Sequence, residues 1–355
     1  MLATVRCVVL AVAVLVVAAR PGPGQPLLKK SPMDRAIDSA VAFLHNTQKT
    51  DGSWSGGRSH SIAVTSLAVM AMLSAGHVPG EGPYGTAIEK GVRWVLSTQK
   101  PNGLFAADGE QTMYHHGIAT LMLSEVCGMV DRDLAREVRP AVEKAVAVIL
   151  KAQRTDNTFG GGWRYQVNHV AGSDISVSGW QIMALRSARN LGCDVPATVI
   201  DNAVAFLKRC QDSRTGGFRY MPGHQITTAC TGTSVLALEL CGKNEHKSQA
   251  VLTGAAYLVR TEHLPRWNER FFFYGIYYGA QATFQVGGNY WSTYRTHLHR
   301  LLLQNQSSSG SWQGNASDST YGANYCTAMA VLATTVEYRY LPIYQRGEEP
   351  TEKER

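Results

Sequence analysis

Nine polar or aromatic residues of this 355-residue chain could bind a ligand or move a proton. A carboxylate and imidazoles can act as acid and base, and their pKa values are often displaced where they meet in a concavity. Aromatic side chains supply the apolar wall that ligand pockets usually have. We therefore expect the nine to line one pocket. They are Tyr114, His115, His116, Asp174, Trp180, His224, Tyr274, Tyr277 and Tyr278.

The rival interpretation of these positions is structural. Six polar residues open segments that are otherwise small and apolar, and capping of free amide groups accounts for a Ser or Thr in such a place. Capping does not account for His116 or Tyr278. Under this interpretation the candidate side chains point between helices and leave no cavity. The six positions are Thr65, His116, Ser178, Thr231, Tyr278 and Thr327.

A phrase that recurs along the chain indicates which elements position the candidates. An apolar run ends in Gln, and a Gly-rich turn with an aromatic residue follows, as in Gln48 to Trp54 and Gln306 to Trp312. Self-similarity of this kind indicates stacked units that bury their apolar faces against their neighbours. The repeated position falls at Gln48, Gln99, Gln153, Gln211, Glu262 and Gln306.

Each unit predicts two helices of different character. In the first, Ala36, Ile37, Ala40 and Leu44 recur on one helix face. The second, as in residues 61–72, is apolar nearly all round, which indicates a buried helix. Six alternations of these two kinds predict an outer ring of helices around an inner ring. The Gln amide and the aromatic ring are expected to hold the turn between them.

The repeated phrase resembles the Q-x-G-x-W-like repeats of the prenyltransferase and squalene cyclase superfamily. The resemblance covers about residues 34–344 and implies an all-α fold, an (α/α)6 toroid of six helix pairs in one domain. The same fold carries cyclases, prenyltransferases, lyases and non-catalytic modules, so the resemblance leaves the activity open.

Terpene cyclases of this superfamily that start by protonating an alkene carry a DxDD motif just before an inner helix. This chain has no DxDD motif, and the aligned stretch reads Asp174-Ile175-Ser176-Val177. Val177 stands where the proton donor would be, and a valine has no proton to give. Cyclisation by that acid is therefore not expected.

A protein prenyltransferase would need a zinc site. His115 and His116 vaguely resemble that family's His ligand region, and His224 and Cys230 precede the fourth inner helix. No Asp-x-Cys pair occurs, and a tetrahedral zinc site needs three or four ligands. We predict no cofactor, with zinc as the alternative.

The fifth unit departs most from the repeat. Its inner helix opens with Phe271-Phe-Phe-Tyr-Gly-Ile-Tyr-Tyr278, which is dense in aromatic residues. Such a run is either a plug of core side chains or the wall of a cavity for a polyisoprenoid or a sugar.

The N-terminal residues 1–24 have the parts of a secretory signal peptide: Arg6, an apolar stretch from Cys7 to Ala19, and small residues before a Pro/Gly-rich segment. An apolar stretch this short is below the ~20 residues of a membrane span, and an uncleaved anchor is the alternative. We therefore expect an exported protein, periplasmic or secreted, that does not span the membrane after cleavage. Residues 345–355 are mostly charged and are expected to be a disordered tail.

The formal net charge is +7, but the basic residues are scattered, so no nucleic-acid partner is expected. Six cysteines follow the signal, with none spaced as CxxC, and several lie in apolar helical runs where a free Cys acts as a small hydrophobe. We expect mostly buried thiols, with one disulfide as the alternative.

Two classes of function remain. The first is a binding or scaffold protein of the cell envelope, whose cavity holds an apolar or glycan ligand or whose rim holds an envelope protein. The alternative is an isoprenoid cyclase or prenyltransferase-like enzyme with a non-standard acid. The missing DxDD motif and the export signal favour the first.

Overall fold

The structure is a computed structural model that describes residues 30–57, 61–106, 111–156, 158–168, 172–242, 244–314 and 317–345. These residues form twelve α-helices and four short 3₁₀ segments. The predicted signal peptide lies outside the described residues, as does the predicted tail after Gln345.

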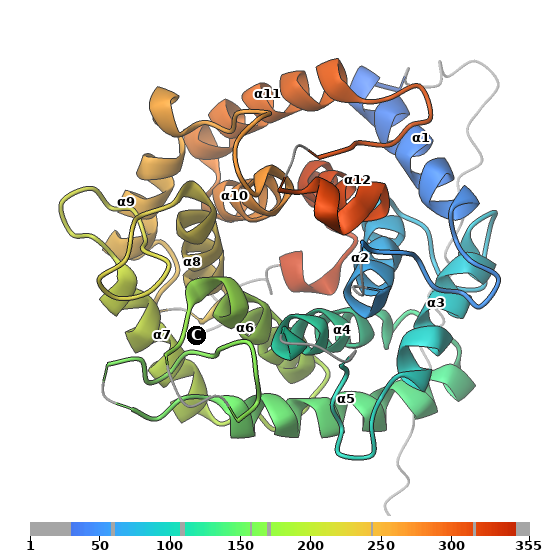
Figure 1. Ribbon diagram of the computed structural model, residues 1–355, viewed down its shortest axis with the longest axis horizontal. Coiled ribbons are helices and arrows are strands. Elements are labelled where there is room, and N and C mark those ends of the chain that lie inside the picture. The colour runs from blue at the N-terminus through green and yellow to red at the C-terminus, as the bar shows by residue number, and fades with distance from the viewer. Residues whose placement is uncertain are drawn as a thin grey trace, which may run out of the picture.

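The helices form two concentric rings (Figure 1). Within the inner ring each helix contacts the next, and the last contacts the first, so the ring is closed. The toroid predicted from the repeat is thus confirmed. The inner helices are α2 (Ser61–Ser74), α4 (Thr112–Val126), α6 (Ile175–Asn190), α8 (Thr228–Leu240), α10 (Phe272–Val286) and α12 (Gly322–Thr334). The outer helices are α1 (Pro32–Asn46), α3 (Gly85–Ser97), α5 (Arg132–Ala152), α7 (Ala197–Cys210), α9 (Gln249–Leu258) and α11 (Gly288–Asn305).

The two kinds of helix are buried as their sequences predict. In α2 every residue from Ile62 to Ser74 is buried, because neighbours surround an inner helix on all sides. In α1 only one face is buried, and it includes Ala36, Ile37 and Leu44.

The repeated Gln joins its own turn to the next outer helix. Gln48 Nε2 donates to the carbonyl of Gly52 at 2.9 Å and to that of Ala87 at 2.8 Å. Gln99, Gln153 and Gln211 make the same pair of bonds in their units. Gln306 donates to the carbonyl of Ala36 at 2.8 Å, which joins the last unit to the first.

A glycine is required where the turn meets the neighbouring helix. Gly52 has φ +93°, and a Cβ there would lie 2.6 Å from the carbonyl oxygen of Lys90. Gly310 has φ +85° and faces the carbonyl of Ser39 in the same way. Only glycine combines this backbone conformation with so close an approach.

The turn aromatic is held at two points. Trp54 Nε1 donates to the carbonyl of Leu44 at 2.6 Å, and its backbone N–H donates to Thr65 Oγ1 at 2.9 Å. Four further turn aromatics donate a backbone N–H to an inner-helix side chain. Those acceptors are His116, Ser178, Thr231 and Thr327. Five of the six aligned inner positions therefore anchor the preceding turn, which is a different task from capping their own helix.

The end of the described chain turns into the centre of the inner ring. The 3₁₀ segments η3 (Val336–Tyr338) and η4 (Pro342–Tyr344) follow α12, and the red segment at the middle of Figure 1 is this part of the chain. Ile343 N donates to Glu125 Oε2 at 2.9 Å, and Tyr344 Oη lies 3.1 Å from Tyr277 Oη. The other two 3₁₀ segments are η1 (Thr261–His263) and η2 (Ser319–Tyr321).

Candidate functional site

Six half-buried tyrosines gather near the N-terminal ends of the inner helices. Tyr114 and Tyr165 stack with their ring centroids 5.9 Å apart, and the hydroxyls of Tyr165 and Tyr220 lie 2.5 Å apart. The rings of Tyr321 and Tyr325 lie 5.0 Å apart. We call this set the tyrosine rim. It consists of Tyr114, Tyr165, Tyr220, Tyr274, Tyr321 and Tyr325.

Electrostatic coupling connects the members of the rim. Burial raises the pKa of Tyr274, Tyr321 and Tyr325, and neighbouring phenols add to it. The phenol of Tyr220 helps to raise the pKa of Tyr274, and the phenol of Tyr274 helps to raise that of Tyr325. The phenol of Tyr165 does the same for Tyr321. Each of these three tyrosines is therefore electrostatically coupled to at least one other phenol of the rim.

A buried ion pair lies within the rim. Arg164 Nη1 donates to Asp174 Oδ2 at 2.7 Å and to Tyr220 Oη at 2.6 Å. Asp174 is fully buried, and its other oxygen accepts from Ser176 Oγ at 2.5 Å and from the N–H of Val177 at 3.0 Å. Burial raises the pKa of the Asp174 carboxyl, while these donors oppose the rise. The bond from Val177 also makes Asp174 the N-cap of α6.

The ion pair continues into the rim through a short hydrogen-bonded chain. Tyr114 Oη lies 2.5 Å from Ser176 Oγ, which in turn donates to Asp174. Burial first, and the charge of Asp174 second, raise the pKa of Tyr114 well above its ordinary value. Tyr114 is thus a neutral phenol that can donate to, or accept from, a ligand at the rim.

Three fully buried aromatic residues lie next to the rim. Trp180 stacks on Tyr277 with centroids 5.3 Å apart, and it meets Tyr278 edge-on at 5.2 Å. Tyr278 in turn contacts the rim residue Tyr274 at 4.9 Å. We call Trp180, Tyr277 and Tyr278 the aromatic floor.

The three predicted histidines are in different surroundings. His116 Nδ1 accepts from the N–H of Phe105 at 3.1 Å, so Nε2 carries the proton and faces the carbonyl of Ala145 at 3.0 Å. Burial lowers the pKa of His116 to about 4, and the ring is neutral at pH 7. His115 is buried on α4, whereas His224 is exposed beside Tyr220, with ring centroids 6.0 Å apart.

The fold thus brings most of the predicted residues together. Tyr114, Asp174 and Tyr274 belong to the rim and its ion pair, and Trp180, Tyr277 and Tyr278 form the floor. His116 holds a turn instead, with both ring nitrogens engaged. That these residues contact a ligand stays a prediction.

The described residues include no cluster of three or more His, Cys, Asp or Glu side chains arranged to hold a metal ion. All six cysteines after the predicted signal are free thiols in the structure.

Sequence reasoning missed Arg164, Tyr165 and Tyr220, although a signal for them is present. The third unit reads Gly161-Gly-Trp-Arg-Tyr165 and the fourth reads Gly216-Gly-Phe-Arg-Tyr220. The same turn therefore delivers an Arg-Tyr pair twice, directly after the repeated aromatic. A copy-by-copy comparison of the two residues after each turn aromatic would have found them.

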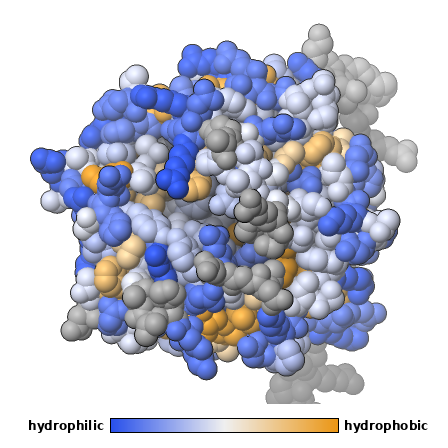
Figure 2. Space-filling model, viewed as in Figure 1, coloured by the Kyte–Doolittle hydropathy of each residue, from blue (hydrophilic) through white to orange (hydrophobic). Residues whose placement is uncertain are grey.

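Figure 2 shows the hydropathy of the face that is seen in Figure 1. Where atoms are coloured, the middle of this face is mostly pale to blue, and the hydrophobic colour forms a patch at the lower edge and smaller patches at the sides (Figure 2).

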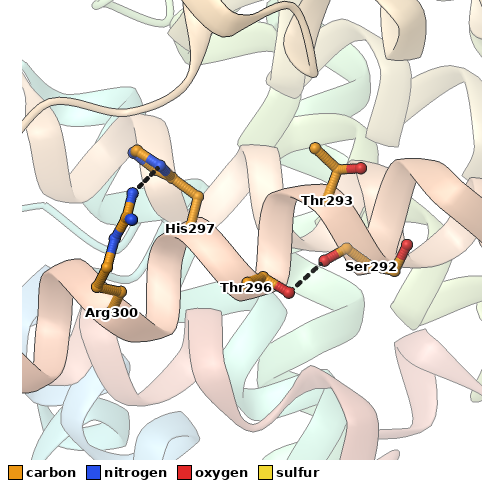
Figure 3. A pocket seen from close by; sticks show the side chains of 5 residues that line it. All are labelled: Ser292, Thr293, Thr296, His297 and Arg300. Carbon is orange, nitrogen blue, oxygen red and sulfur yellow. Dashed lines mark hydrogen bonds between the residues drawn. The ribbon is translucent and has the colours of Figure 1, made fainter.

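A hollow lies on the outer helix α11 (Figure 3). Its lining residues are Ser292, Thr293, Thr296, His297 and Arg300. Arg300 bonds to His297 on the same helix, and His297 Nε2 lies 2.7 Å from the carbonyl of Pro265. Because these bonds are internal and come from one helix face, the rim is the stronger candidate.

Solved structures similar to this chain include two kinds of enzyme. An inactive alpha-1,6-mannanase variant from a Salegentibacter species, bound to alpha-1,6-mannotriose, aligns with TM-score 0.66 and 10% identity over 85% of this chain and 99% of that one. A GH76 alpha-mannanase from Bacteroides thetaiotaomicron aligns with TM-score 0.61 and 13% identity over 87% and 97%. A type II terpene cyclase from Scytonema, bound to geranylgeranyl dihydroxybenzoate, aligns with TM-score 0.55 and 14% identity over 86% and 96%.

At such identities these likenesses concern the fold alone. Among curated protein sequences, none matches this chain. The family model of the prenyltransferase alpha-alpha toroid domain matches residues 24–172 and again residues 164–262. Because these matches cover more than half of the sequence, the chain belongs to the prenyltransferase alpha-alpha toroid domain family.

Proposed function

We propose that this protein binds a glycan at the tyrosine rim. The observation that carries the proposal is the rim itself: half-buried phenols arranged around the Arg164–Asp174 ion pair. Phenol faces pack on sugar rings, and phenol hydroxyls exchange hydrogen bonds with sugar hydroxyls. A few placed polar groups in an aromatic surrounding are typical of ligand sites.

The aromatic floor favours a glycan over a polyisoprenoid. Trp180, Tyr277 and Tyr278 pack on one another, and Tyr277 is bonded to Tyr344 of the C-terminal segment. A cavity for an isoprenoid would need the faces of these aromatic rings to contact the ligand, whereas here the rings contact one another. The polar groups, by contrast, lie at the rim, where Arg164, Tyr165 and Tyr220 are partly exposed.

The solved neighbours are compatible with a glycan ligand. They include alpha-mannanases, one of which holds alpha-1,6-mannotriose. The variant in that complex is inactive, with two consecutive aspartates replaced. No two consecutive aspartates occur in this sequence. We therefore propose binding and make no claim of hydrolysis.

The proposed setting is the cell envelope, after export by the N-terminal segment. Among the described helices, none has the length and apolar character of a membrane span. An envelope glycan would be the natural ligand for such a protein.

Calorimetry and native mass spectrometry test the proposal. The purified protein is titrated with alpha-1,6-mannotetraose and a panel of neutral and amino oligosaccharides, and separately with squalene and geranylgeranyl diphosphate. We expect an oligosaccharide to bind and the isoprenoids not to bind. Binding or conversion of an isoprenoid, with no sugar bound, would instead support the alternative enzyme.

One substitution connects the binding to the rim. Tyr220→Phe removes a single hydroxyl and should weaken sugar binding about five- to tenfold. Tyr340→Phe is the matched control, because Tyr340 is exposed near Gly76, at the opposite end of the inner helices. Equal affinities for these two variants would place the ligand elsewhere.

A further inference from the structure

Asp318 is a buried carboxylate with no role in the glycan site proposed above. It directly precedes η2 and is 0% exposed. Neither of its oxygens has a hydrogen-bond partner of normal geometry within the described part of the chain. A buried polar group normally has such a partner, so this one calls for an explanation.

A second acidic residue lies near Asp318. Burial raises the pKa of Glu269 to about 7, and the charge of Asp318 adds to the rise. Burial also raises the pKa of Asp318 to about 6, while the amides of Phe272 and Phe273 at the start of α10 oppose it. The amide of Tyr321 donates to the Asp318 carbonyl at 3.0 Å, and the Tyr325 ring lies 5.0 Å from the Tyr321 ring. We call the two carboxyls, Tyr321 and Tyr325 the Asp318 corner.

Two arginines near the Asp318 corner, Arg270 and Arg266, contact other groups. The guanidinium of Arg270 lies over the Phe271 ring, 4.7 Å from its centroid, and it acts electrostatically on Tyr321. Arg266 lowers the pKa of Glu269, and its guanidinium also donates to the carbonyl of Glu262. Asp318 itself makes no ion pair among the described residues.

Helix capping is the plain explanation for this arrangement. Ser317 Oγ accepts from the N–H of Phe271 at 3.0 Å, and Asp318 faces the next two amides. However, an amide or hydroxyl side chain would cap the helix without burying a charge. A buried carboxylate is costly unless it is paired, so it takes up either a proton or a cation.

We propose that the Asp318 corner binds the ammonium group of an amino sugar in the glycan. The inference rests on the proposed glycan site, which shares Tyr321 and Tyr325. A carboxylate bond to an ammonium is charge-assisted, and phenol faces attract cations, so both kinds of group at this corner favour the same ligand charge.

The test compares two tetrasaccharides that differ only in that group. Binding of a glucosamine tetramer and of an N-acetylglucosamine tetramer is measured by calorimetry at a pH of about 6.5, on the full chain. The native protein should bind the amine at least about tenfold more tightly. Asp318→Asn keeps an acceptor for the α10 amides. It should abolish the preference, so that the variant binds the two tetramers with about equal affinity.

Two further variants keep the result interpretable. Glu269→Gln changes the half-buried member of the corner, and it should lower the preference even if Asp318→Asn folds poorly. Asp212→Asn is the control, because Asp212 pairs with Arg219 outside the corner, and it should leave the preference unchanged.

The outcomes separate this inference from the proposed function. Equal affinity of the native protein for the two tetramers would overturn the amino-sugar inference and leave the glycan site standing. A preference that survives both corner substitutions would also overturn it. If no sugar binds at all, the proposed function fails, and the amino-sugar inference fails with it.

Discussion

Two carboxylates of this ring are equally buried and have opposite surroundings. Asp174 receives one bond from Arg164, one from Ser176 and one from the amide of Val177. Asp318 receives none of normal geometry among the described residues, and Glu269 lies close by. Both precede an inner helix, so the fold alone does not account for the difference.

The contrast suggests different tasks for the two sides of the rim. A satisfied ion pair fixes the positions of the groups around it, and here it holds Tyr220 and, through Ser176, Tyr114. Among the described residues, Asp318 has only the amides at the start of α10 opposite it, and a buried carboxylate without a cation favours the uptake of a cation or a proton. We therefore expect the Asp174 side to hold the sugar-binding groups in position, and the Asp318 side to select the charge of the ligand.

The largest effect is expected from breaking the satisfied pair. Arg164→Gln leaves the buried Asp174 without its cation, and removal of one partner of a buried pair typically costs about 3–5 kcal/mol. Urea unfolding should show this loss in the free energy of unfolding. Arg139→Gln is the control, since Arg139 pairs with Glu143 on the surface and should lose less than about 1 kcal/mol. Similar losses in the two variants would mean that the buried pair contributes little.

A smaller effect of opposite sign is expected at the unsatisfied carboxylate. The pKa of Asp318 is about 6 in the folded chain and 3.8 for the free group, so the folded state holds its proton more tightly. Stability from this group is therefore fully present below about pH 4 and falls as the pH rises to about 6. Asp318→Asn should raise the free energy of unfolding at pH 7 by about 1–3 kcal/mol.

The pH dependence gives a second readout for the same variant. Glu125 and Glu269 also have raised pKa values, about 7 each against 4.5 for the free group, and contribute a loss of the same sign between about pH 4.5 and 7. Asp318→Asn should therefore make the loss between about pH 4 and 6 smaller, and should leave the glutamate contribution, which continues to about pH 7. Thermal unfolding across this range measures it. An Asn variant that is less stable at pH 7 would mean that the charge caps α10 productively.

Repetition made the ring predictable. A Gln that recurs before each turn makes the same two bonds in five units, so one pattern predicts five sets of contacts. The alignment of inner helices was equally informative, because Thr65, Ser178 and Thr231 all accept the turn amide. Because each unit builds the same turn, the same residue types recur at the same positions of the turn.

The site was predictable only in part, because its function depends on departures from the repeat. Asp174 and Tyr274 were found as polar or aromatic residues at helix starts. His116 has the same position but serves the turn, since an imidazole nitrogen can replace a Thr hydroxyl as acceptor. The pairing of Arg164 with Asp174 depends on how two turns meet in space, and residue type alone does not contain that information.

The smallest effect is expected at the aromatic floor. There, too, one buried polar group has a hydrogen-bond partner and another has none in the described part of the chain, but both groups are uncharged. Tyr277 Oη bonds to Tyr344 Oη, whereas Tyr278 Oη is equally buried and has no partner within the described residues. Tyr277→Phe should cost about 1 kcal/mol, because it leaves the Tyr344 hydroxyl without its partner. Tyr278→Phe removes an unsatisfied group and should be neutral or slightly stabilising. Paired urea titrations measure both. A loss at Tyr278 as large as that at Tyr277 would mean that its hydroxyl has a partner after all, such as a bound water that the floor retains.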